Sequence, residues 1–243
     1  MNKLDEIEKT LTSLPRQNSR QMQQVPARGD LHLSMSYADF LTQVDEAKQA
    51  EWVNGETIIF MPPGRRHQDL VTFLAALLRI FVEHFQLGEL LVAPFEMKMS
   101  LDGNAREPDL LFVAHEHLDR LTEQRLIGPA DLVVEVISPE SVYRDRSDKF
   151  DEYEAAGIRE YWLVDARPGK EQAHFWALSA AGRYQALPVE QDGIVRSLVL
   201  TDFWLKVDWL LQEPKPNPLL LFTEIIGLPP AISELFRPRP RTE

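Results

Sequence analysis

The alternation of apolar and polar positions predicts both helices and strands in the middle of the chain. From residue 67 to 85, apolar side chains recur at helical spacing, which is typical of an amphipathic helix, and Gly88 is expected to end it. Two apolar runs within residues 51–61 flank Asn54-Gly55, a dipeptide that strongly favours the tight turn of a β-hairpin. The middle of the chain therefore shows both the helical and the strand periodicity.

Further apolar runs extend this pattern toward the C-terminus. Short runs rich in branched apolar residues predict strands at 90–99, 108–113, 131–137 and 161–165, and an antiparallel pair at 173–178 and 183–187. Helices are predicted over 115–121 and 147–156, and Gly157 is expected to end the second in a left-handed conformation. We therefore expect an α/β fold class.

Changes in composition divide the chain into three segments. Residues 1–33 begin with apolar residues at helical spacing and continue as a polar, glutamine-rich stretch, so they are predicted to be a helix and a linker. Residues 34–210 contain the periodic segments and are predicted to be the folded domain. Residues 211–243 are rich in proline and are predicted to be a tail with little regular structure beyond the apolar run 219–226. The N-terminal helix is either a frayed extension or a docking segment for a protein partner or a second subunit.

Composition limits the class of protein. The chain of 243 residues is long enough for one sizeable core, and it has no cysteine, which excludes disulfides, thiolate zinc sites and cysteine nucleophiles. No apolar run approaches the roughly 18 residues that span a membrane, and the first residues lack the apolar segment of a secretory signal. We therefore expect a cytoplasmic protein with no membrane partner. The net charge of −12 argues against broad, non-specific binding to nucleic acid, although a local basic rim can coexist with it.

The most informative residue is Glu135, which interrupts the apolar run 131–137. This run predicts a strand that is buried on both faces. An ionised carboxylate in such a strand costs several kcal/mol unless a partner neutralises it, so the sequence predicts either a buried ion pair or a metal site. Asp109 offers a second carboxylate at the start of another apolar strand, and Lys149 follows on a predicted helix.

These three residues supply the groups that phosphodiester hydrolysis needs. A divalent cation, hard oxygen ligands and a nearby positive charge are required. Asp109 and Glu135 can be the oxygen ligands if their strands are neighbours, the carbonyl of Val136 can add a third oxygen, and Lys149 can supply the charge. Lys149 also has an ordinary interpretation as a surface residue paired with Asp145 and Glu152.

Several other charged residues are candidates for supporting roles. Glu51, at the start of a predicted strand, is expected to assist the metal or to fix Lys149. His67, at the start of the long helix, is a candidate substrate-binding residue. Five arginines flank these segments and are interpreted either as phosphate contacts or as solvated loop charges: Arg65, Arg66, Arg106, Arg144 and Arg146. Of these, Arg144 and Arg146 are the candidates for substrate binding.

Taken in order, four segments resemble blocks of a known family. They are 51–68, 107–113, 131–141 and 145–165. Together they are similar to the Uma family of putative restriction endonucleases, within the PD-(D/E)XK nuclease superfamily, over roughly residues 34–205. The resemblance implies a restriction-endonuclease-like core, with a central mixed β-sheet flanked by helices and a metal site at the sheet.

The resemblance also implies a role for each candidate residue. Asp109 and Glu135 correspond to the acidic metal ligands, and Glu51 corresponds to an early acidic residue of the family. Ile137 stands where the wider superfamily has its lysine, and the family draws that lysine from the next helix, where this chain has Lys149.

We therefore expect a Mg²⁺- or Mn²⁺-dependent endonuclease acting on DNA, targeted by a protein partner or by homodimerisation. Two alternatives stay open. The chain could be a non-catalytic binding or assembly module that keeps the nuclease fold, or Glu135 and Lys149 could form only a structural ion pair.

Overall fold

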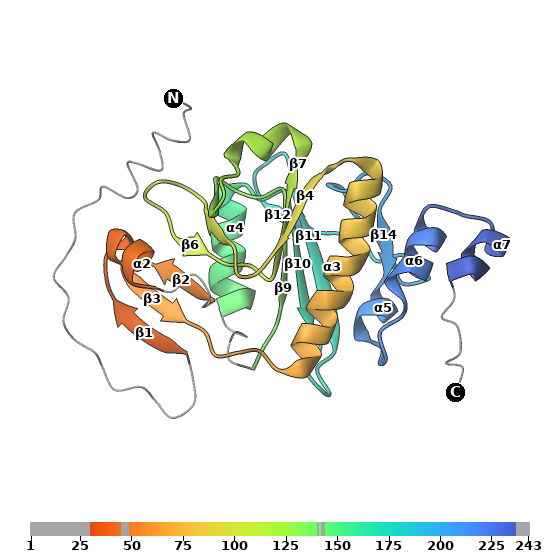
Figure 1. Cartoon of the computed structure of the whole chain (residues 1–243), viewed down its shortest axis with the longest axis horizontal. Helices are drawn as coiled ribbons and strands as arrows, with labels where there is room; N and C mark the ends of the chain where they lie inside the picture. Colours follow the sequence, from red (N-terminus) through yellow and green to blue (C-terminus); the bar gives the residue numbers. More distant parts are fainter. Residues whose placement is uncertain (1–29, 45–48, 140, 142–143, 237–243) are drawn as a thin grey trace.

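The computed structural model describes residues 30–44, 49–139, 141 and 144–236 (Figure 1). The predicted N-terminal helix and most of the predicted linker lie outside these ranges. The described chain forms two six-stranded sheets, a two-stranded sheet and several helices. The predicted mixture of strands and helices is thus confirmed. None of the helices in the described ranges has the length and apolar content that a membrane crossing requires.

The first sheet, called here the N-terminal sheet, gathers strands from the first half of the chain. In spatial order it contains β1 (Leu31–Ser34), β3 (Glu56–Ile59), β2 (Ala50–Val53), β6 (Ala105–Arg106), β5 (Glu96–Lys98) and β8 (Arg125–Ile127). The predicted hairpin is confirmed, because β2 and β3 pair antiparallel around Asn54 and Gly55, both of which have positive φ. The helix α2 (Tyr37–Gln43) packs on this sheet and is capped by the side chain of Ser36.

The second sheet, called here the central sheet, carries the buried strands. In spatial order it contains β12 (Tyr184–Ala186), β11 (Gln172–Leu178), β10 (Glu160–Asp165), β9 (Leu132–Val136), β7 (Leu110–Ala114) and β4 (Gly88–Val92). The sheet is mixed, because β9 and β10 run parallel while β9 and β7 run antiparallel. The prediction of a central mixed sheet is confirmed.

Two helices cover opposite faces of the central sheet (Figure 1). The apolar stripe of α3 (Arg65–Phe85) packs against Val134 and Val136 of β9, while Tyr153 of α4 (Lys149–Ala156) packs with Val133 on the other face. Every residue of β9 is buried, which confirms that this strand is covered on both faces. Glu135 alternates with Val134 and Val136, so its side chain points to the face covered by α4.

The prediction that Gly88 ends the long helix was wrong. The helix α3 ends at Phe85, with Gln86 as the left-handed cap, while Gly88 already begins β4. Gly88 is needed for a close approach, because a Cβ there would lie 2.0 Å from the carbonyl oxygen of Val113. Gly157 does end α4 with a positive φ, as predicted.

The single strand predicted over 90–99 is also wrong. The chain forms β4 in the central sheet and then β5 in the N-terminal sheet. Pro94 lies between them and has no N–H to donate to a neighbouring strand, so strand pairing is interrupted there although the apolar pattern of the sequence continues. The next predicted strand, over 108–113, begins only at Leu110. Residues 107–109 instead connect β6 of one sheet to β7 of the other.

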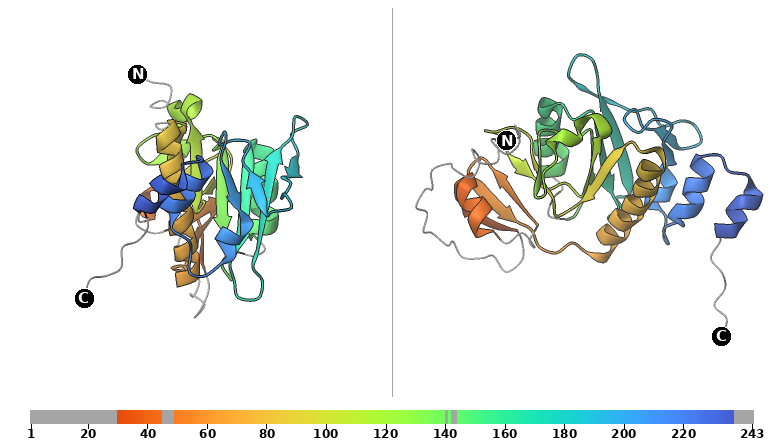
Figure 2. Two further views of the ribbon diagram at one scale, coloured as in Figure 1. Left: turned by 90° about the vertical axis from the view of Figure 1, so that its right-hand side faces the viewer. Right: turned by 45° about the horizontal axis from the view of Figure 1, so that its top comes forward.

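The last described part of the chain adds to the core. After β13 (Ile194–Arg196), β14 (Trp204–Lys206) and α5 (Val207–Leu211), the apolar run predicted within the tail forms α6 (Pro218–Ile225). This helix lies against α3 and buries Leu221, Phe222 and Ile225 in the same core (Figure 2). The short helix α7 (Pro230–Ser233) follows. Part of the segment that composition marks as a tail is therefore packed structure.

Candidate active site

Asp109 and Glu135 lie side by side where the central sheet opens into a cavity. The antiparallel register pairs Leu110 with Val134, so Asp109 and Glu135 follow as the next opposing positions. Asp109 is fixed there because its Oδ2 accepts a hydrogen bond from the backbone N–H of Val136 at 2.7 Å. All three residues line a cavity of about 500 Å³. The structure thus brings together the three residues that the sequence proposed as metal ligands.

Glu135 is 3% exposed and uses one carboxylate oxygen for its partners. Its Oε1 accepts hydrogen bonds from Lys149 Nζ and from the Tyr153 hydroxyl, each at 2.7 Å. Burial raises the pKa of Glu135, and the ammonium of Lys149 offsets only part of that effect. Among the residues that the structure describes, none donates a hydrogen bond to Oε2 of Glu135, so this oxygen remains available to a ligand.

Lys149 is buried at the start of α4, so its interpretation as a surface residue is wrong. Its Nζ lies 2.7 Å from Glu135, 2.9 Å from Glu51 and 3.6 Å from the Oδ1 of Asp145. Burial alone would lower the pKa of Lys149, but these carboxylates outweigh burial and raise it. Lys149 therefore carries its charge inside a cluster of three acids.

Glu51 is fully buried on β2, and each of its oxygens has a cationic partner. Its Oε1 pairs with Lys149 at 2.9 Å and its Oε2 accepts a hydrogen bond from Arg106 Nη1 at 2.7 Å. Burial alone would raise the pKa of Glu51, but Lys149 and Arg106 lower it to about 2. Of the two roles that the sequence suggested for Glu51, this geometry favours holding Lys149.

His67 lies on the first turn of α3 and reaches back to the carboxylates. Its Nε2 is 3.2 Å from Oδ2 of Asp109, and its ring lines the cavity. Burial alone would lower the pKa of His67, but the hydrogen bond and charge of Asp109 raise it. The histidine therefore contacts a proposed ligand directly.

The five arginines fall into different environments. Arg65, Arg66 and Arg144 line the cavity, and Arg144 pairs with Asp30 at 3.3 Å while it lies over the ring of Phe60. Arg146 lies outside this cavity lining and pairs with Asp165 at 3.3 Å.

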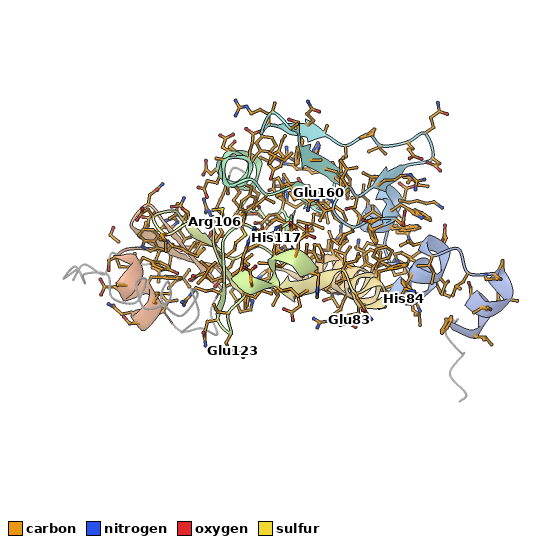
Figure 3. The ribbon with its side chains drawn as sticks, turned by 90° about the horizontal axis from the view of Figure 1, so that it is seen from above. Glu83, His84, Arg106, His117, Glu123 and Glu160 are labelled. Atoms are coloured by element: carbon orange, nitrogen blue, oxygen red, sulfur yellow. The ribbon has the colours of Figure 1, made fainter. Side chains whose placement is uncertain are left out.

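Arg106, which is labelled in Figure 3, has a different environment from the other four arginines. The interpretation of Arg106 as a loop residue that contacts phosphate is wrong, because it lies in β6 and is 1% exposed. It makes a bidentate pair with Glu152, through Nε and Nη2 at 2.8 and 2.6 Å, in addition to its bond to Glu51.

Sequence reasoning missed one acidic residue of this cluster. Asp145 is buried in the π-helical turn Arg144–Asp148 and lines the cavity. Its Oδ1 is buried and accepts no hydrogen bond from any residue that the structure describes. The signal was present as the spacing of four residues to Lys149, but that spacing also describes an ordinary surface pair on a helix.

The donor set fits a divalent cation of the magnesium class. Asp109 Oδ1 and Glu135 Oε2 accept no hydrogen bond from any described residue, and Val136 lines the same cavity. In the described ranges no three His, Cys, Asp or Glu side chains are arranged to hold a metal by themselves. Two carboxylates with a carbonyl, completed by water and phosphate oxygens, are the incomplete protein set that Mg²⁺ usually takes.

Comparisons with known proteins agree on the kind of fold. The model of the Uma2 family, described as putative restriction endonuclease, matches residues 37–208. Among solved structures, the chain is similar to the crystal structure of a putative nuclease belonging to DUF820 from Anabaena variabilis ATCC 29413, with a TM-score of 0.57 and 15% identity over 70% of this chain and 94% of that chain. A search of curated proteins found no match. At such low identity the structural likeness shows a shared fold.

Proposed function

Since this chain belongs to the Uma2 family of putative restriction endonucleases, we propose that it is a metal-dependent endonuclease of the PD-(D/E)XK type that acts on DNA. The family resemblance expected from the four sequence blocks is thereby confirmed. The observation that carries the proposal is the pairing of Asp109 with Glu135 on one cavity wall, with Lys149 held 2.7 Å from Glu135.

Asp109, Glu135 and the carbonyl of Val136 would hold Mg²⁺ or Mn²⁺. When bound, such an ion neutralises a phosphate oxygen and acidifies a water molecule. Asp109 is oriented for this role by the N–H of Val136 and by His67. Glu135 keeps one oxygen for the ion because Lys149 and Tyr153 both bind the other.

Lys149 would orient the attacking water or stabilise the charge that develops on the phosphate. Its ammonium is fixed by Glu51 and Glu135, so little reorganisation is needed when that charge appears. Three further residues line the cavity and would contact the flanking phosphates: Arg66 and His67, on the first turn of α3, and Arg144. Arg146 would contact them from beside the cavity.

The net charge of −12 predicts that the protein binds DNA weakly by itself. We therefore propose that targeting comes from a protein partner, through the N-terminal segment, or from homodimerisation.

The direct test is cleavage of single- and double-stranded DNA in Mg²⁺ or Mn²⁺. Wild type is compared with Asp109→Ala, Glu135→Ala and Lys149→Ala, and with Glu83→Gln as a control on the exposed Arg79–Glu83 pair at the far end of α3. We expect cleavage by wild type and the control, and none by the three site variants that retain a cooperative melting transition. Absence of wild-type cleavage on every substrate would contradict the proposal.

One observation favours a second candidate, a binding module that keeps the nuclease fold. Lys149 already neutralises Glu135 at 2.7 Å, so the pair is stable without an ion. A metal titration separates the two functions. A binding module should melt at the same temperature with and without Mn²⁺, whereas the nuclease should be stabilised through Asp109 and Glu135.

A further inference from the structure

A continuous chain of alternating charges runs from the protein surface to the proposed active site. We call it the ion chain, and its members in order are Glu152, Arg106, Glu51, Lys149 and Glu135. The successive oxygen–nitrogen distances are 2.6, 2.7, 2.9 and 2.7 Å. Glu152 is the partly exposed end, with 24% of its side chain accessible, and the other four members are buried. The two outer members, Arg106 and Glu152, are not among the residues that line the cavity.

Arg106 determines how Glu51 can be shared. A buried carboxylate with a single cationic neighbour attracts that neighbour strongly, because no other cation competes for its oxygens. Arg106 occupies Oε2 of Glu51, so that Lys149 meets only Oε1. Lys149 is thus held between Glu51 and Glu135, instead of being drawn fully onto Glu51.

Glu152 connects α4 to β6. It follows Lys149 by three residues on this helix, and its two oxygens form a planar bidentate pair with Arg106 of β6. Glu51 and Arg106 belong to the N-terminal sheet, whereas Glu135 belongs to the central sheet. The Arg106–Glu152 pair therefore ties α4 to the N-terminal sheet, and the Lys149–Glu135 pair ties the same helix to the central sheet.

We propose that Arg106 and Glu152 are positioning residues that hold Lys149 at its distance from Glu135 without contacting the substrate. This inference rests on the proposed nuclease function and adds to it a role for two residues that the sequence did not place in the site. When the Lys149 ammonium is displaced, the other residues that line the cavity remain in place to bind DNA. Loss of the pair should therefore lower kcat and leave KM nearly unchanged.

The test uses Glu152, whose partial exposure allows substitution without a buried cavity. Glu152→Ala removes the bidentate pair, and Glu152→Gln keeps the shape and one acceptor. Arg106→Lys keeps a charge beside Glu51 but cannot make the bidentate pair. Glu83→Ala removes a matched Arg–Glu pair at 2.8 Å on α3 and is the control, well separated from Arg106 (Figure 3).

We expect Glu152→Ala to reduce kcat roughly tenfold, Glu152→Gln to restore most of that loss, and Glu83→Ala to change neither kcat nor KM. Arg106→Lys should reduce kcat at least as much as Glu152→Ala if it folds. Unchanged kcat in folded Glu152→Ala would overturn the proposal, and so would a loss that appears only in KM.

A second readout does not depend on activity. The ¹H–¹⁵N signal of the Lys149 ammonium, assigned by its absence in Lys149→Met, reports the position and protection of Nζ. We expect this signal to shift and to exchange faster in Glu152→Ala, with an intermediate change in Glu152→Gln and none in Glu83→Ala. If wild type cleaves no DNA but this shift occurs, the nuclease function fails while the positioning role stands. If wild type cleaves and the signal is unmoved, the positioning role alone fails.

Discussion

Two buried glutamates on neighbouring strands of the central sheet are satisfied in different ways. Glu160 on β10 is bound on both oxygens by neutral donors: Trp162 Nε1 on Oε1, and the Ser197 hydroxyl with the N–H groups of Leu198 and Val199 on Oε2. Glu135 on β9 is bound on one oxygen, by a lysine and a tyrosine, and its carboxylate lines the cavity.

Burial of a carboxylate therefore does not by itself indicate a site. Glu160 attaches the segment after β13 to the sheet, and its hydrogen-bonding capacity is used within the protein. Glu135 retains an oxygen for a ligand and has a second carboxylate, Asp109, at the adjacent register position. The carboxylate oxygen that Glu135 retains for a ligand distinguishes the candidate site from the structural role of Glu160. Making the same substitutions at both glutamates tests this distinction.

The largest expected difference is in activity. Glu135→Gln should reduce kcat/KM for DNA cleavage by roughly 10³-fold or more, because the amide cannot replace the charge that holds the metal. Glu160→Gln should leave kcat/KM close to the wild-type value. Steady-state cleavage assays on both folded variants measure this, and equal losses in the two would remove the distinction.

The next effect is on stability and should have the opposite pattern. Glu160→Ala leaves an indole N–H and two backbone N–H groups without their acceptor, which should lower the free energy of unfolding by about 3 kcal/mol. Urea denaturation measures this change. A loss below about 1 kcal/mol would show that water or neighbouring groups replace the carboxylate easily.

A metal titration should also distinguish the candidate site from the region around Glu160. At roughly 100 times its dissociation constant, Mn²⁺ should raise the free energy of unfolding of wild type by about 2.7 kcal/mol. The same gain should occur in Glu160→Ala relative to its own metal-free state, and it should disappear in Asp109→Ala. Differential scanning fluorimetry is sufficient, and a full response in Asp109→Ala would place the metal elsewhere.

The smallest effect is a contrast in pH dependence between Glu160 and the fully buried Glu51. Lys149 and Arg106 outweigh burial and lower the pKa of Glu51 from 4.5 to about 2, so its contribution to stability is complete above pH 4.5 and is lost as the pH falls toward 2. Burial raises the pKa of Glu160, and the hydrogen bonds offset only part of this, so its contribution is complete below pH 4.5 and is lost as the pH rises through the raised pKa.

Substitution should therefore show opposite trends. As the pH falls, the destabilisation by Glu160→Gln should grow through the raised pKa until pH 4.5. Below pH 4.5 the destabilisation by Glu51→Gln should shrink, by about 1 kcal/mol over the first pH unit. Chemical denaturation of the variants and wild type across this range measures both trends. Parallel trends would mean that at least one of the two pKa directions is wrong.

The sequence predicted the proposed metal ligands because their signals are local. Glu135 is a single charge in a short apolar run, and Asp109 stands directly before another. The geometry around them depends on contacts between distant residues. Arg106 binds a residue 55 positions away and another 46 positions away, so nothing near it in the sequence distinguishes it from a solvated loop arginine.

The fold shows the same division. Helix α3, the β2–β3 hairpin and β9 were predicted from periodicity, because each is defined by its own residues. The division of the strands between two sheets was not predicted, since β4 and β5 read as one apolar run across Pro94. The packing of α6 against α3 was also missed, because proline content describes a segment's composition but not its partner.

The short segment 107–109 connects β6 of the N-terminal sheet directly to β7 of the central sheet. Arg106 ends one strand in the N-terminal sheet, and Asp109 stands immediately before the next in the central sheet. A proposed ligand and a member of the ion chain thus lie at the two ends of one short connection, so a shift of one sheet relative to the other would displace both residues. A residue inserted here would shift Asp109 relative to Arg106 and so disturb the metal ligands and the ion chain together. The exposed β11–β12 turn could accommodate the same insertion as a slightly longer loop.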